Sequence, residues 1–122
     1  MLVIRKAQIE VLGDEMRSRL HHELAVHARQ FFPDECAAMS DEELLQRMRS
    51  SAEAAARWGL RSPRDVCRFA NLSMLFGAGF DSNPRMKWIY EMLSDAVVPS
   101  RSQRLSQVYA EAVRRLKNGG EV

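Results

Sequence analysis

The segment 58–84 constrains the fold of this chain most strongly, because its glycines, prolines and short polar residues mark the ends of helices. Gly59 stands where the C-terminus of a helix favours a residue that can adopt positive φ. Ser62, Pro63 and Asp65 have the spacing of an N-cap, a first-turn proline and an acidic N3 residue. One helix is therefore predicted to end near residue 58, and a second to begin near residue 63.

The same segment also ends the second helix and begins a third. Gly77 and Gly79 follow a run of apolar residues and predict the end of the second helix. Ser82 or Asn83, directly before Pro84, is a suitable N-cap for the helix that follows. The second helix is apolar around much of its circumference, so we expect it at the centre of the fold. These signals together predict an all-α protein.

Apolar residues recur every three or four positions in the rest of the chain, which is the periodicity of amphipathic helices. Asp14 is predicted as the N-cap of a long first helix, and Ser40 with Glu43 matches a capping box for the next. The segment 2–4 is expected to be extended, and the sequence Asn-Gly-Gly from Asn118 onward to end the last helix. Helices are expected over residues 15–32, 41–58, 63–76, 84–93 and 102–117.

The last of these helices shows one apolar side clearly. Its inward residues are expected to be Leu105, Val108, Tyr109, Ala112, Val113 and Leu116. The loops between the helices are short, which predicts a compact bundle of five to six helices. A length of 122 residues leaves room for a single domain spanning 1–122.

Composition and charge describe an ordinary globular chain. Apolar residues make up 46% and charged residues 28%, which argues against disorder. The net charge is +2, with 8 basic and 10 acidic residues in 1–60, and 10 basic and 6 acidic residues in 61–122. This asymmetry favours a solvated surface of mixed sign, and an acidic partner for the C-terminal half is the alternative.

Cysteine content and hydropathy indicate the cellular compartment in which the chain is expected. Cys36 and Cys67 are too few for a disulfide framework and are expected to be free, buried thiols, although pairing between them stays open. The N-terminal apolar run is short for a signal peptide, and no segment has the length and hydropathy of a membrane span. The chain is therefore expected in the cytoplasm, without a membrane partner.

No residue pattern points to catalysis or to a metal. His21, His22 and His27 share one predicted helix, but steps of six and five residues rotate them by about 240° and 140°, so they cannot hold one ion. A GxSxG elbow is absent, and the carboxylates beside Cys36 would raise the pKa of its thiol. The Gly-Ala-Gly sequence at 77–79 follows a helix, which favours capping over phosphate binding. We therefore expect no enzyme activity, metal site or cofactor.

The main alternative from another class is a DNA-binding regulator of helix-turn-helix type. Gly59 and Leu60 fit the turn of that motif, and Arg64 and Arg68 supply positive charge. The register then fails, because the next buried positions of the motif would fall on charged residues, one position before the apolar ones. A recognition helix also needs a polar outer face, and a charge of +2 attracts phosphate weakly. Nucleic acid is therefore not the expected partner.

Protein binding is the function class that remains. The chain has seven methionines and two tryptophans, and these side chains adapt to and anchor protein interfaces. We predict a partner-binding surface around Phe80, Asp81, Arg85 and Trp88. The alternative interpretation is that these apolar residues pack the core and the loop. A homodimer also stays possible.

The whole chain resembles a known bacterial family through two sets of residues. The first is an MxVIRxxQ start, at Met1, Val3, Ile4, Arg5 and Gln8, with Phe31-Phe32-Pro33 and Cys36 further on. The main signature comprises Gly59, Asp65, Val66, Phe69, Leu72, Gly77, Phe80 and Asp81, followed by Trp88. Arg104, Leu105 and Tyr109 of the closing helix also fit. With these features the chain resembles the small all-helical accessory proteins found in type VI secretion effector gene clusters.

This resemblance implies accessory work in an antibacterial secretion system. The protein would act as a co-chaperone or loading factor for an effector or its spike-tip adaptor. The alternative within the same class is an immunity protein that neutralises a cognate toxin. Immunity proteins commonly present a strongly charged face, so the near-neutral charge of this chain favours the accessory role.

Overall fold

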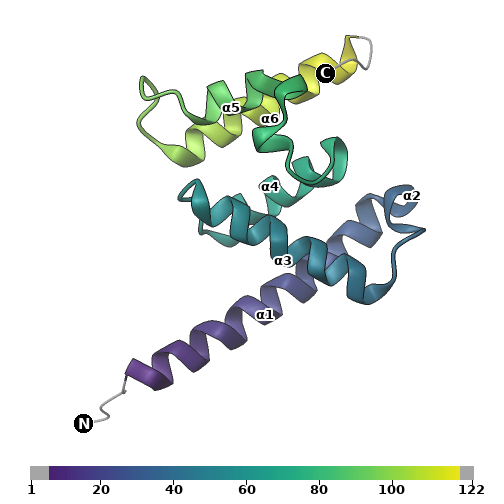
Figure 1. The fold of residues 1–122 in the computed structure, drawn as a ribbon, viewed down its shortest axis with the longest axis vertical. Helices are drawn as coiled ribbons and strands as arrows, with labels where there is room; N and C mark the ends of the chain where they lie inside the picture. The colour runs from purple at the N-terminus through teal and green to yellow at the C-terminus, as the bar shows by residue number, and fades with distance from the viewer. Residues whose placement is uncertain (1–5, 119–122) are drawn as a thin grey trace. The chain divides into compact units, whose positions relative to one another are not determined.

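The computed structural model describes the backbone of residues 6–118 and the side chains of residues 15–118. Within these residues every regular element is helical, as predicted (Figure 1). Six α-helices are present there, with two 3₁₀ turns between α4 and α5. Their bounds are α1 Lys6–Phe31, α2 Pro33–Cys36, α3 Asp41–Arg57, α4 Pro63–Phe76, η1 Phe80–Ser82, η2 Pro84–Met86, α5 Lys87–Leu93 and α6 Arg101–Lys117. The all-α class is therefore confirmed.

The chain divides into two compact units, residues 1–49 and 50–122. The single domain over 1–122 stays a prediction. Among the described residues, no helix combines the length and the hydropathy needed to cross a bilayer.

The predicted ends of α3 and α4 are confirmed by their capping geometry. Gly59 has φ +77°, and its amide and that of Leu60 donate to the carbonyls of Ala56 and Ala55, both at 2.9 Å. This pair of bonds is a Schellman motif, which satisfies the last carbonyls of α3. At the start of α4, the amide of Asp65 donates to Oγ of Ser62 at 3.2 Å. Local sequence chemistry therefore places both helix ends.

Two predicted helix starts are wrong. The first helix begins at Lys6, so Asp14 lies within α1 and is not its N-cap. Helix-forming residues precede Asp14. Gly13 destabilises the helix by about 1 kcal/mol, which is too little to end α1 at this position. The fifth helix begins at Lys87, because residues 84–86 form the separate turn η2. The predicted extended segment 2–4 and the two glycines after Asn118 lie outside the described residues.

The core of the C-terminal unit is built around α4, which buries seven of its fourteen residues. The ring of Phe69 on α4 lies 4.9 Å from that of Phe80 in η1. Helix α6 packs against both α4 and α5, and it buries Leu105, Val108 and Ala112. The central position predicted for α4 agrees with the burial of half of its residues. Two residues that were expected inward on α6 are exposed instead, Val113 at 43% and Leu116 at 40%.

Candidate functional site

The four residues predicted to bind a partner differ in their accessibility. Phe80 is 1% exposed and packs in the core, so it can contact a partner only if the core unpacks. Asp81 is half-buried, and its Oδ2 accepts a hydrogen bond of 2.9 Å from Nε1 of Trp58. Arg85 is the one member of the four whose side chain is exposed. Phe80 thus packs in the core and Asp81 holds a hydrogen bond to Trp58, and their part in partner binding stays a prediction.

Trp88 is half-buried between α4 and α6. Its ring meets that of Phe76 edge to face, with 6.4 Å between the centroids. The guanidinium of Arg115 lies 4.2 Å from the centroid of the Trp88 ring, in cation–π geometry. Arg115 also donates to Oε1 of Glu111 at 3.0 Å. Its charge is therefore compensated within the molecule by a carboxylate and a ring. No local sequence signal links Arg115 on α6 to Trp88 on α5.

On another side of α6, three side-chain hydrogen bonds join this helix to α4. Their donors and acceptors are Ser102 to Asp65 at 2.9 Å, Arg68 to Ser106 at 2.9 Å and Asn71 to Tyr109 at 3.0 Å. The paired residues are 37, 38 and 38 positions apart in the sequence. A nearly constant separation means that the two helices run in the same direction, with one bond per helical turn. These three hydrogen bonds, which we call the seam, hold α4 and α6 in a fixed register.

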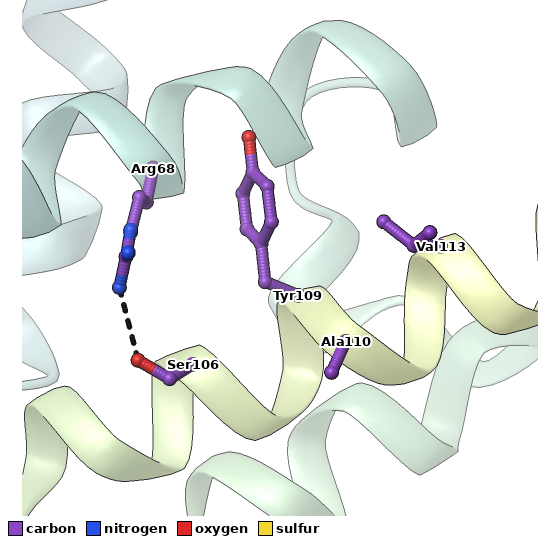
Figure 2. A pocket seen from close by; sticks show the side chains of 5 residues that line it. All are labelled: Arg68, Ser106, Tyr109, Ala110 and Val113. Carbon is purple, nitrogen blue, oxygen red and sulfur yellow. Dashed lines mark hydrogen bonds between the residues drawn. The ribbon is translucent and has the colours of Figure 1, made fainter.

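A groove of about 360 Å³ follows this seam. It is lined by Arg68, Ser106, Tyr109, Ala110 and Val113. Figure 2 shows the Arg68 side chain reaching from α4 to Ser106, with the Tyr109 ring rising beside it and Val113 further along α6. The groove therefore has a cationic end at Arg68 and an apolar end at Val113. We call it the α4–α6 groove.

The seam changes character after its third hydrogen bond. Leu75 and Val113 also lie 38 positions apart, which places them level with each other one turn beyond Asn71 and Tyr109. Both side chains are exposed, at 44% and 43%. Leu116, at 40%, follows one turn later on α6. Three exposed apolar side chains thus follow the last hydrogen bond of the seam, and Val113 is the one of the three that lines the groove.

The two helices of the groove are strongly basic. They carry seven arginine and lysine residues against two acidic ones, Asp65 and Glu111. Asp65 is buried, at 7% exposure, and accepts from Oγ of Ser102. Hydrogen bonds from Arg114 and Arg115 lower the pKa of the Glu111 carboxyl to about 2. Both carboxylates therefore already have internal partners.

A second groove, of about 570 Å³, lies within the N-terminal unit between α1 and the start of α3. Arg29, one of its lining residues, donates to the carbonyls of Cys36 at 3.3 Å and Met39 at 3.0 Å. It also forms an ion pair of 2.8 Å with Asp41. These bonds fasten the C-terminus of α1 to the α2–α3 connection, so Arg29 acts as a structural clamp.

The cysteines and histidines form no metal-binding group in the described part of the chain. Cys36 is buried, Cys67 is half-buried and both are free, which confirms the expectation of unpaired thiols. Burial raises the pKa of both thiols above its ordinary value. Within residues 15–118, no group of three or more His, Cys, Asp or Glu side chains is placed to hold a metal ion.

Comparisons of the chain with family models, curated proteins and solved structures found no match. The resemblance to accessory proteins of type VI secretion therefore stays a prediction. The groove was missed at the sequence level, although one signal was present. Val113 is rotated by about 80° from the stripe that begins at Leu105, so it lies toward the edge of that stripe.

Proposed function

We propose that this protein is a non-catalytic protein-binding module and that the α4–α6 groove is its binding surface. The observation that carries the proposal is the exposed apolar group of Leu75, Val113 and Leu116 at the end of a hydrogen-bonded seam. Protein interfaces commonly combine an apolar centre with a polar rim. The register of the seam keeps this surface formed before a partner arrives, which lowers the entropic cost of binding.

Burial of α4 supports protein binding over the helix-turn-helix alternative. A recognition helix presents polar side chains to the DNA groove along its length. After Pro63 and Arg64 at its start, α4 has one further exposed residue, Leu75. The polar Arg68 and Asn71 are half-buried and bonded to α6. The surface of α4 thus favours a protein partner.

The sequence resemblance supports a finer proposal about the partner. Within the protein-binding class, we propose an accessory role toward a type VI secretion effector or its spike-tip adaptor. An immunity protein against a cognate toxin is the second candidate, since the same groove would also take a toxin segment. These two roles differ in what the bound protein does after binding.

The test is affinity purification of the tagged protein from its native host. The original protein, Val113→Asp and Val97→Asp are compared; Val97 is 88% exposed and lies outside the groove, so it is a matched control. We expect the original protein and the Val97 variant to recover a partner that the Val113 variant loses. A captured adaptor or carrier domain supports the loading role, and a toxin domain whose activity falls on binding supports immunity.

One further variant separates the groove from the surface predicted from sequence. Arg85→Glu changes the exposed member of that predicted surface. Loss of the partner with Arg85→Glu and retention with Val113→Asp would contradict the groove as the binding surface. Circular dichroism melts of all variants establish that each one folds.

A further inference from the structure

We infer that the occupant of the α4–α6 groove is an acidic amphipathic helix of the partner, which places a carboxylate on Arg68 and an apolar side chain on Val113. This inference rests on the proposed function and adds the chemistry of the partner to it. Three features of the groove carry the inference: its charge, the free capacity of the Arg68 guanidinium, and the distance between its two ends.

The charge of the surface selects an acidic occupant. Arg68 is the one charged residue among those that line the groove, and the two acidic residues of α4 and α6, Asp65 and Glu111, already accept hydrogen bonds from within the unit. Opposite potentials across an interface raise the association rate and exclude partners of like charge. A basic or neutral helix would meet uncompensated positive charge at this surface.

The chemistry of Arg68 identifies the contact that recognises the acid. A guanidinium has five N–H donors, and Nη1 of Arg68 donates to the neutral hydroxyl of Ser106 at 2.9 Å. The remaining donors suit a carboxylate, which binds a guanidinium through two parallel hydrogen bonds. Arg115, by contrast, is already bound to a carboxylate and an indole ring. Arg68 is therefore the arginine of this helix pair that lines a groove and donates to a neutral hydroxyl instead of a carboxylate.

The length of the groove sets the spacing in the partner. Arg68 is level with Ser106, and Val113 lies seven residues further along α6, which is two turns or about 10.5 Å. A helix lying along the groove would match it with Asp or Glu at one position and Leu, Ile or Met seven positions away. A small or apolar residue between them would cover Ala110. This is the side-chain pattern of helix-in-groove recognition.

The first experiment selects ligands from a displayed library of 18-residue helix-forming peptides on the purified full-length protein. We expect the enriched peptides to be acidic, with a carboxylate and a large apolar residue seven positions apart. Their affinity for Val113→Asp should fall at least about tenfold, while Val97→Asp should bind as the original protein does.

The outcomes separate this inference from the proposed function. Enriched peptides that depend on Val113 but show no acidic preference would overturn the inference and leave the groove as a protein-binding surface. Enrichment that is insensitive to Val113→Asp, or no enrichment, would overturn both. A 20-base-pair DNA duplex that binds and loses binding with Arg68→Glu would assign the charge to nucleic acid and overturn the inference as well.

A second experiment isolates the role of Arg68 from its structural bond. Arg68→Gln removes the cation, whereas Ser106→Ala removes the internal hydrogen bond and keeps the cation. An enriched acidic peptide should bind Arg68→Gln about tenfold more weakly or worse, and Ser106→Ala as tightly as the original protein. Exposed Arg57 on α3, substituted as Arg57→Gln, is the charge-matched control. Equal losses for Arg68→Gln and Ser106→Ala would assign Arg68 to the seam alone and overturn the inference.

Discussion

Two arginines on either side of α6 have different environments, although both lie beside an aromatic residue of the same unit. Arg115 lies over Trp88 and is bound to Glu111, so its charge is compensated by an anion and a ring face. Arg68 reaches into the α4–α6 groove and donates to the hydroxyl of Ser106, which carries no charge. One side of α6 therefore uses its cation for internal stability, and the other side presents a cation at a groove. Both side chains are half-buried, so the two arginines differ in the charge of their partners while their burial is similar.

The largest expected difference in stability is between an apolar residue of the core, Phe80, and an apolar residue of the groove, Val113. Phe80→Ala should lower the free energy of unfolding by about 3–5 kcal/mol, because its buried ring packs on Phe69. Val113→Ala in the groove should change it by less than about 0.5 kcal/mol, because the side chain is already exposed. Urea unfolding followed by circular dichroism measures both values. Similar losses for the two variants would mean that the groove is part of the core.

Within the seam, two serines of α6 form a matched pair. Ser102→Ala removes the donor to the buried carboxylate of Asp65 and should cost about 1–3 kcal/mol. Ser106→Ala leaves the half-buried Arg68 able to reach water, so we expect a loss below about 1 kcal/mol. The same urea titrations give both numbers. A larger loss for Ser106→Ala would show that the Arg68 bond is a major source of stability.

The two arginines themselves give a smaller difference. Arg115→Gln removes the cation–π contact and one ion pair, with an expected loss of about 1 kcal/mol. Arg68→Gln removes one hydrogen bond to a hydroxyl and should cost about 0.5 kcal/mol. Melting temperatures at two salt concentrations provide the measurement, since high salt should weaken the Arg115 pair. A larger loss of stability for Arg68→Gln than for Arg115→Gln would mean that the Arg68 guanidinium serves the fold and not the binding of a partner.

The smallest effect is the pH dependence that Glu111 confers. Its pKa in the folded protein is about 2, below its usual value of 4.5, because Arg114 and Arg115 donate hydrogen bonds to the ionised form. A lowered pKa stabilises the fold above about pH 4.5, and this contribution is lost as the pH falls toward 2. The melting temperature of Glu111→Gln should thus be below that of the original protein at pH 7 and should converge with it near pH 2. A gap that stays constant over this range would contradict the role of ionised Glu111.

Local signals in the sequence were sufficient for part of the fold. The Schellman motif at Gly59 and the cap at Ser62 follow from residues within one turn of each other, so their interactions form as soon as the helix does. The prediction failed at Asp14, where a good capping residue lies inside a longer helix. A cap preference of about 1 kcal/mol is outweighed when helix-forming residues continue on both sides.

The candidate site depended on contacts that local signals do not contain. Periodicity correctly placed Leu105, Val108 and Ala112 inward on α6. It could not reveal that Leu116, on the same stripe, lies 40% exposed in the last turn of the helix. The period of a helix identifies the buried face, but the extent of burial depends on the length and position of the neighbouring helices.

By itself, the sequence determined the helical class, the ends of α4 and the basic character of residues 61–122, because each depends on residue type and near neighbours. Only the tertiary structure decided which side of α6 binds Trp88 and which forms a groove with α4. Residues about 38 positions apart meet there, and their pairing depends on how two helices pack. The same packing placed Phe80 in the core and Val113 at the surface, since burial is a property of the assembled fold.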